Sequence, residues 1–281
     1  METIAALLTV HNRREKTIAC LDNLFKQDLP PGVDLKVYLT DDGCTDGTRE
    51  EVTERFPQVT IIDGDGSLFW NRGMVVAWKK AAMSTPDYYL WLNDDTFIYS
   101  NTIKHLLESS SMHENKSVIV GTTCAVGNPE VITYGGWIDG KIISNVNTEQ
   151  KCDTLNGNIV LVPRAVYEIL GTNDPYYRHA VGDTDYGLRA NEHGLEVWTV
   201  RGIMGECDVH EHPTVWMDPS QPLKKRWRNF FSPTGNNPFE FFHFRKKHYG
   251  LLPACITFVS NFVHFLFPWF WKESYKDYSE N

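Results

Sequence analysis

Residues 35–48 read LKVYLTDDGCTDGT and join a short apolar run to an acidic, glycine-rich turn. The apolar run, rich in β-branched and aromatic side chains, predicts a buried strand over residues 35–40. The Asp and Gly residues predict a turn after it, and Asp46 or Thr48 can cap a helix that runs to Phe56. The stretch therefore predicts a strand–turn–helix unit, which is the building block of a parallel sheet covered by helices.

The same alternation continues on both sides of this unit. Further strands are expected at residues 4–10, 59–63 and 88–92. Helices are expected between them, at residues 13–26 and 72–83. The pattern predicts the α/β class, with a mixed, mostly parallel sheet that carries helices on both faces.

Length and composition set the expected domains. The chain has 281 residues, of which 42% are hydrophobic and 22% charged. This composition excludes a fibrous or wholly disordered protein, and the length suits one α/β domain with a tail. We expect the α/β domain over residues 1–205 and a C-terminal helical extension over residues 206–281.

The distribution of charge separates the tail from the rest. A net charge of −9 argues against a general nucleic-acid-binding protein. Between residues 222 and 250, however, seven Lys and Arg accompany Glu240 alone. Residues 251–271, LLPACITFVSNFVHFLFPWFW, are uncharged, but prolines and polar residues interrupt them, so a spanning helix is not favoured. The tail suits an anionic membrane surface, or a helix pair packed on the protein or on a second copy in a homo-oligomer.

The cysteines indicate the compartment. The six cysteines lie apart without a CxxC pair, and no signal peptide precedes the first predicted strand. We expect free thiols in a reducing, cytoplasmic setting and no zinc held by cysteine clusters. With the basic tail, this predicts a cytoplasmic protein bound peripherally to the inner face of the cell membrane.

Two acidic pairs mark a candidate site. Asp41 and Asp42 follow the strand at 35–40, and Asp94 and Asp95 follow the strand at 88–92. Open α/β sheets bind ligands beyond the carboxyl ends of their strands, so both pairs indicate a site at that edge. Dinucleotide and P-loop motifs are excluded, because residues 64–69, GDGSLF, place Phe at the third glycine position and no Walker A lysine motif occurs.

Four motifs follow one another along the chain: TVHNR at 9–13, DDGCTDGT at 41–48, WLNDD at 91–95 and GDTDYGLRA at 182–190. Together, in this order, they resemble the inverting family 2 glycosyltransferases of GT-A fold. The resemblance covers about residues 3–205 and is most like the bacterial branch that builds O-antigen, capsule and related cell-surface polysaccharides, including rhamnosyl- and galactofuranosyltransferases.

The resemblance implies a donor pocket beyond the first two strands. By position, Asp42 would hydrogen-bond the nucleotide base, and Thr9, His11 and Arg13 would line the same pocket. A carboxylate accepts the imide N–H of uracil or thymine, which implies a UDP- or dTDP-sugar donor. A solvent-facing turn residue is the alternative for Asp41. Arg72, at the start of a predicted helix, could reach the donor phosphates.

The resemblance also implies a Mn²⁺ or Mg²⁺ ion. The sequence Asn93-Asp94-Asp95 matches the DxD motif of the family, with Asn in place of the first Asp. Asp95 would ligate the cation, while Asn93 and Asp94 would lie beside the donor. A late histidine completes the metal site in related enzymes. His210 is preferred here, with His212 and a pair of surface histidines as alternatives.

The fourth motif implies which residue acts as the catalytic base. Asp183 aligns with the catalytic Asp of the Glu-Asp pair in the family, and Gly182 replaces the Glu. A carboxylate there would take the proton of the acceptor hydroxyl, although Asp183 could instead cap a helix over residues 186–193. Asp185 would contact the acceptor or pair with Arg189. The aromatic face of Trp137 suits an acceptor sugar, with core packing as the alternative.

These features predict a metal-dependent inverting glycosyltransferase of the hexosyltransferase class. It would move a sugar from a UDP- or dTDP-sugar to a saccharide acceptor, expected to be lipid-linked. A sugar-phosphate nucleotidyltransferase is a second hypothesis, but residues 7–12, LLTVHN, lack the glycine-rich loop that such an enzyme needs. A sugar-nucleotide-binding scaffold without catalysis is the third, because Asn93 and Gly182 depart from the family pattern.

Overall fold

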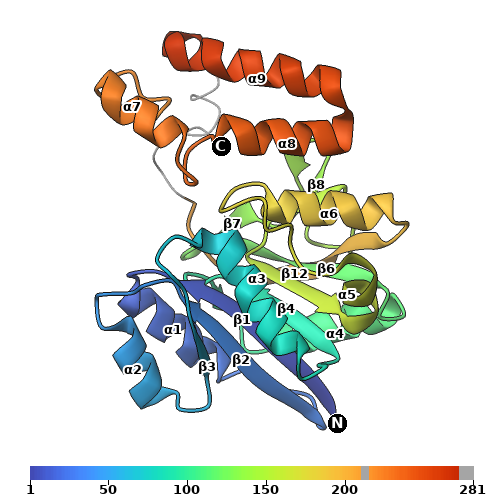
Figure 1. The fold of residues 1–281 in the computed structure, drawn as a ribbon. Coiled ribbons are helices and arrows are strands. Elements are labelled where there is room, and N and C mark those ends of the chain that lie inside the picture. Colours follow the sequence, from blue (N-terminus) through green and yellow to red (C-terminus); the bar gives the residue numbers. More distant parts are fainter. Residues whose placement is uncertain (210–214, 272–281) are drawn as a thin grey trace. The chain divides into compact units, whose positions relative to one another are not determined.

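The computed structural model describes residues 1–209 and 215–271 (Figure 1). Contacts divide the chain into two compact units. The N-terminal unit comprises residues 1–175 and 182–209, and the C-terminal unit comprises residues 176–181 and 210–281. Among the described residues, no helix has the length and apolar character needed to cross a membrane.

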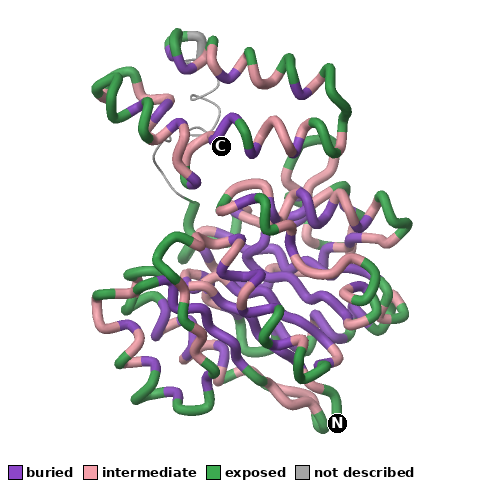
Figure 2. The backbone as a smooth tube through the Cα atoms, viewed as in Figure 1, coloured by how far each residue is buried: buried purple, intermediate pink, exposed green. Residues whose placement is uncertain are grey.

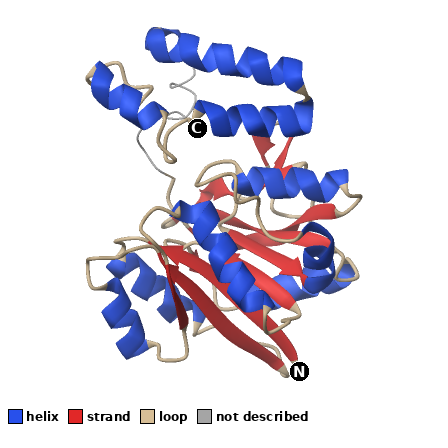
Figure 3. Cartoon of the chain, viewed as in Figure 1, coloured by secondary structure: helices blue, strands red, loops and turns tan. Residues whose placement is uncertain are grey.

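The N-terminal unit alternates strands and helices along much of its length (Figure 3). Its strands are β1 Glu2–Val10, β2 Val33–Asp41, β3 Thr60–Asp63, β4 Tyr88–Leu92, β5 Phe97–Ile98, β6 Ser117–Ala125, β7 Asn128–Tyr134, β8 Gly136–Ile138, β9 Lys141–Ile142, β10 Thr154–Leu155, β11 Ile159–Pro163 and β12 Glu196–Glu206. Its helices are α1 Arg14–Leu24, α2 Thr48–Arg55, α3 Phe69–Ala82, α4 Thr102–Met112, α5 Arg164–Leu170 and α6 Gly182–Glu192.

The main sheet is mixed and mostly parallel, as predicted. Its strand order within the described residues is β3-β2-β1-β4-β11-β6-β12-β5, and β7 pairs with β6. The strands β3, β2, β1 and β4 run parallel to one another, and β6 runs parallel to β12. In the middle of the sheet, β11 runs antiparallel to both β4 and β6. The strands β10, β8 and β9 form a small separate sheet.

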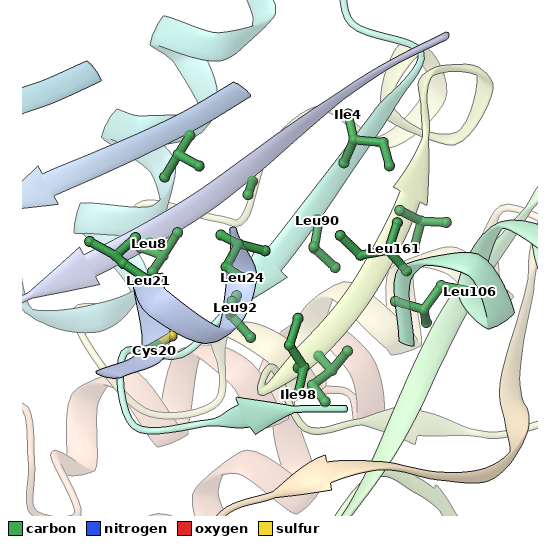
Figure 4. Close-up of a cluster of buried hydrophobic side chains, with 14 of the residues drawn as sticks. Ile4, Leu8, Cys20, Leu21, Leu24, Leu90, Leu92, Ile98, Leu106 and Leu161 are labelled. Atoms are coloured by element: carbon green, nitrogen blue, oxygen red, sulfur yellow. The ribbon is translucent and has the colours of Figure 1, made fainter. Parts of the chain in front are cut away.

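Two hydrophobic layers cover the sheet, because successive side chains of a strand point to opposite faces. In β1, Ile4 and Leu8 pack with α1, α2 and α4, whereas Ala5 and Leu7 pack with α3, α5 and α6. Figure 4 shows the first layer, in which Leu21 of α1 and Leu106 of α4 meet the sheet. Figure 2 shows the strands as the most buried part of this unit. The prediction of helices on both faces is confirmed.

The C-terminal unit holds helices α7 Leu223–Phe230, α8 Pro238–Tyr249 and α9 Leu251–Leu266, followed by a 3₁₀ turn at Pro268–Trp271. Trp216, Phe230 and Phe265 form its own buried core. The segment 176–181 joins α8 through an ion pair from Arg178 Nε to Glu240 Oε1 at 2.6 Å. This unit therefore has a core of its own.

One basic residue of the tail belongs to this core. Arg226 is buried, donates hydrogen bonds to the carbonyl oxygens of Trp216 and Phe265, and lies over the Phe265 ring. Its charge is therefore not available to an external partner. Lys224, Lys225 and Arg228 on the same helix are exposed.

Candidate active site

The candidate site lies at the carboxyl edge of the parallel strands. Thr9 of β1 pairs with Thr40 of β2, and Leu7 pairs with Trp91 of β4, so the three strands end close together. Their following loops carry the predicted motifs at residues 11–13, 41–48 and 93–95. The sheet register thus brings three motifs, distant in sequence, to one edge.

Arg13 bridges the acidic pair that follows β4. Its guanidinium lies 2.6 Å from Asp94 Oδ1 and 2.6 Å from Asp95 Oδ2. The Asp94 side chain is 4% exposed and that of Asp95 is 11% exposed. Burial raises the pKa of Asp94 to about 6 against the opposing attraction of Arg13. The Thr17 hydroxyl, 3.4 Å from Asp94 Oδ2, completes its surroundings.

This acidic pair fits a divalent cation by its donor chemistry. Carboxylate oxygens are the ligands that Mg²⁺ and Mn²⁺ prefer, and the pair already accepts the cationic guanidinium of Arg13. Within the described residues, no group of three or more metal-ligating side chains is assembled. The proposed ligand His210 and its alternative His212 lie outside the described residues, so their metal role stays a prediction.

Asp42 is occupied by the backbone in this structure. Its Oδ1 accepts the amides of Gly66 at 2.8 Å and Leu68 at 3.2 Å, and its Oδ2 accepts the amide of Phe69 at 2.8 Å. The residue is 3% exposed. These bonds hold the loop before α3, where Phe69 has a left-handed φ of 56°. The contact of Asp42 with the nucleotide base stays a prediction. In the structure, Asp42 anchors the loop that precedes α3.

This anchoring role predicts a loss of stability on substitution. Asp42→Ala should lower the free energy of unfolding by about 3 kcal/mol, because it removes a buried, charged acceptor that three backbone amides share. Urea denaturation of the purified protein measures this value. Asp65→Ala is the matched control, because Asp65 is an exposed carboxylate of the same loop. Equal stability of both variants would contradict the anchoring role.

The other predicted donor residues surround this loop. His11 Nδ1 lies 2.6 Å from the carbonyl oxygen of Asp42, and the imidazole is exposed. Thr9 packs so closely against Gly73 of α3 that a Cβ at position 73 would collide with it. Arg72 donates to the carbonyl oxygen of Pro175 at 2.9 Å. All three lie at the predicted edge, and their donor contacts stay predictions.

Asp183 occupies the first turn of α6, which begins earlier than the helix predicted over residues 186–193. Its Oδ1 accepts the Thr184 amide at 2.8 Å, and its Oδ2 accepts the Gly157 amide at 3.0 Å. Desolvation raises the pKa of Asp183 above its ordinary value, although these amide hydrogen bonds oppose the shift. A carboxylate with a raised pKa and a fixed orientation is suited to proton transfer.

The departure at Gly182 has a steric reason. Gly182 lies against the buried side chain of Asn71, so that a Cβ at position 182 would collide with the Asn71 amide group. Asn71 Nδ2 in turn donates to the carbonyl oxygen of Asp174 at 2.8 Å. Sequence reasoning missed Asn71. The signal in the sequence was a polar amide, Asn71, at a buried position of helix α3, where an apolar side chain is usual.

Asp185 is paired inside the protein. It is fully buried, and its Oδ2 accepts from Arg189 Nε at 2.8 Å. The ion pair allowed by the i,i+4 spacing is therefore present. The predicted acceptor contact of Asp185 stays a prediction, and it requires this ion pair to open, because the carboxylate has no exposed surface.

Two further side chains approach the region of Asp183. The indole Nε1 of Trp137 donates to Asn156 Oδ1 at 2.6 Å, next in sequence to Gly157. The indole Nε1 of Trp70 donates to Asn93 Oδ1 at 2.7 Å. The Asn that replaces the first Asp of the acidic motif thus holds a tryptophan.

Comparisons with known proteins agree with this architecture. The family model for Glycosyl transferase family 2 matches residues 6–167, which is more than half of the chain. The protein belongs to this family, and its mixed, mostly parallel sheet flanked by helices is consistent with the GT-A fold. A search of curated proteins finds no match.

Solved structures share the fold at low sequence identity. The mannosyltransferase PcManGT from Pyrobaculum calidifontis, in complex with GDP-Man and Mn²⁺, has 15% identity and a TM-score of 0.58 over 99% of this chain and 83% of that chain. S. aureus TarS 1–349 has 15% identity and a TM-score of 0.58 over 94% and 81%. In another TarS structure, with 14% identity and a TM-score of 0.57, the match covers 85% of this chain but only 45% of that chain.

Proposed function

We propose that this glycosyltransferase is metal-dependent and inverting, and that it transfers a hexose-type sugar from a UDP- or dTDP-sugar to a saccharide acceptor. The acceptor we propose is lipid-linked, in cell-surface polysaccharide synthesis of the rhamnosyl- or galactofuranosyltransferase kind. The observation that carries the proposal is the placement, within one unit, of an acidic pair, Asp94 and Asp95, bridged by Arg13, and of a carboxylate at Asp183 whose pKa burial raises.

These groups divide the reaction between them. The acceptor oxygen forms a bond to the anomeric carbon, and the bond from that carbon to the diphosphate oxygen breaks. Asp183 accepts the proton of the attacking hydroxyl. Asp95 would hold Mn²⁺ or Mg²⁺, which when bound supplies positive charge for the departing diphosphate, and Asp94 would lie beside the donor. Attack opposite to the leaving group inverts the anomeric configuration.

The solved structures support a nucleotide-sugar donor without naming it. One TarS structure contains UDP-GlcNAc, and the mannosyltransferase contains GDP-Man and Mn²⁺. A donor panel should therefore include UDP-glucose, UDP-GlcNAc, UDP-galactofuranose, dTDP-rhamnose and GDP-mannose. We expect release of UDP or dTDP that requires Mn²⁺ or Mg²⁺ and stops with EDTA. Donor binding without any release would favour the scaffold hypothesis.

We further propose that the C-terminal unit binds an anionic membrane surface from the cytoplasmic side. Along α9 the exposed apolar side chains recur at helical spacing and form one stripe. The same unit exposes basic residues on α7 and near the end of α8. Apolar and basic surface together suit the interface of an anionic bilayer. The stripe consists of Leu252, Ile256, Val259, Val263 and Leu266.

Substitution of the stripe should release the protein from vesicles. Phe265 of α9 belongs to the buried core, so deleting α9 would damage this unit, whereas Ile256 and Val259 are 62% and 60% exposed. The double variant Ile256→Ser/Val259→Ser should bind phosphatidylglycerol vesicles at least about tenfold more weakly, because each apolar side chain contributes about 1.5–3 kcal/mol when buried. Vesicle flotation measures the bound fraction, which for the wild type should fall with salt.

A matched control separates this surface from general hydrophobicity. Met83 and Met112, exposed in the N-terminal unit, are replaced together by Ser and should leave flotation unchanged. Equal vesicle binding of the stripe variant and the wild type would contradict membrane binding. A wild-type dimer in solution that the stripe variant dissociates would instead assign the stripe to a homo-oligomer.

A further inference from the structure

Trp70 connects the two predicted halves of the site. It belongs to the first turn of α3, and its ring is partly exposed. Its Nε1–H donates to Asn93 Oδ1 at 2.7 Å, which fixes one end of the indole beside the acidic motif. The ring also meets Trp91 edge-on at a centroid distance of 6.2 Å. The hydrogen bond to Asn93 and the contact with Trp91 therefore hold the indole in one orientation.

The six-membered ring of the indole, on the same edge as its N–H, reaches the surroundings of Asp183. A Cβ added to Gly157 would lie 2.6 Å from Cζ2 and 2.6 Å from Cη2 of Trp70, and 3.3 Å from Cβ of Asp183. The amide of Gly157 donates to Asp183 Oδ2 at 3.0 Å. Gly157 thus leaves the space that lets the indole lie next to the predicted base.

The backbone before Trp70 is also fixed. Phe69 has a φ of 56°, a conformation that costs free energy for a bulky residue, and its amide donates to Asp42 Oδ2 at 2.8 Å. Trp78 and Trp91, by contrast, are fully buried in the core layer. A strained backbone that presents a partly exposed tryptophan between Asn93 and the surroundings of Asp183 points to a ligand contact rather than to core packing alone.

The proposed reaction defines what must lie beside this indole. During transfer, the anomeric carbon is joined to the diphosphate on one side and approaches the acceptor oxygen on the other. The diphosphate belongs near Asp95 and the acceptor hydroxyl near Asp183. The transferred sugar ring therefore occupies the interval between them, and Trp70 lies along this interval between Asn93, two residues before Asp95, and Gly157, which contacts Asp183. The C–H face of a sugar packs favourably on an aromatic ring.

We propose that Trp70 is the platform on which the transferred sugar of the donor packs, and that it determines which sugar the enzyme accepts. This inference rests on the proposed function. Asn93 is then a positioning residue, because it acts by holding the indole N–H. In the proposed arrangement only the sugar ring packs on Trp70, so its contribution to donor binding can be measured separately from that of the nucleotide.

Calorimetry tests the platform by measuring, in the presence of Mn²⁺, the affinity for two ligands. One is the sugar nucleotide selected by the donor panel, and the other is its free nucleoside diphosphate. Trp70→Leu should weaken binding of the sugar nucleotide about tenfold and leave binding of the nucleoside diphosphate within about twofold. Trp70→Phe retains an aromatic face but has a smaller ring and no N–H for Asn93, so it should weaken sugar-nucleotide binding measurably, though less than Trp70→Leu. Trp198→Leu is the matched control, because Trp198 is also partly buried and donates its Nε1–H to a side chain, Glu196, at 2.9 Å.

The outcomes are distinguishable. An equal loss for sugar nucleotide and nucleoside diphosphate in Trp70→Leu, or no loss for either, overturns the platform while leaving the proposed function intact. If Trp70→Leu fails to fold, Trp70→Phe is the deciding variant. The proposal is then overturned if Trp70→Phe keeps both the sugar-nucleotide affinity and the donor preference of the wild type. Failure of the wild type to bind every donor and every nucleoside diphosphate would refute the proposed function and the platform together.

Discussion

Asp95→Ala is expected to abolish sugar transfer and to weaken Mn²⁺-dependent binding of the donor diphosphate by at least about tenfold. The substitution removes a hard oxygen ligand from the acidic pair. The fold should persist, because Asp95 lies in the loop after β4 and Arg13 keeps its second partner, Asp94, at 2.6 Å. Calorimetric titration with UDP or dTDP, with and without Mn²⁺, measures the loss, and circular dichroism checks the fold.

A control for charge alone is available in the adjacent helix. Glu15 is exposed in the first turn of α1, so Glu15→Ala removes one negative charge near the site without removing a proposed ligand. Its metal-dependent binding and its turnover should remain near those of the wild type. Unchanged metal-dependent diphosphate binding in Asp95→Ala would remove Asp95 from the metal site.

The regular parts of the fold could be predicted because their signals are local. The apolar run at residues 88–92 corresponds to β4 over the same residues, and that at 35–40 lies within β2. The start of α3 was predicted three residues late, because a left-handed residue, Phe69, bound through its amide to Asp42, begins the helix. No local pattern announces that β11 enters the sheet antiparallel between β4 and β6. That placement depends on pairing between distant segments.

In the site, too, local sequence predicts the position of a residue, and contacts between distant segments determine its partners. Three of the four motifs lie at strand ends, those of β1, β2 and β4, which share one edge because the carboxyl ends of parallel strands meet there. What each side chain contacts depends on its neighbours in space. Asp42 meets three backbone amides, Asp185 meets Arg189, and Gly182 meets Asn71 across a helix contact that only the folded chain creates. Residue types therefore predict a chemical capacity, and tertiary packing decides which part of it remains available to a substrate.

Asp183→Asn should lower turnover by about 100-fold or more, with little change in donor affinity. The amide keeps the size of the carboxylate and one oxygen that can accept the Gly157 amide, but it cannot take a proton from the acceptor hydroxyl. The effect should therefore fall on kcat rather than on donor binding. Steady-state kinetics with the selected donor, together with calorimetry of the donor alone, separate the two.

The pH profile gives a second readout that a merely structural role would not produce. A base must be ionised, and burial raises the pKa of Asp183, so the acidic limb of kcat/KM should lie above the ordinary Asp value of about 4. Asp183→Asn should remove this limb along with the activity. Near-normal turnover in Asp183→Asn with the acidic limb unchanged would transfer the role of base to another group. Asp185 is a poor substitute, because it is fully buried against Arg189 and could reach an acceptor only after that ion pair opened.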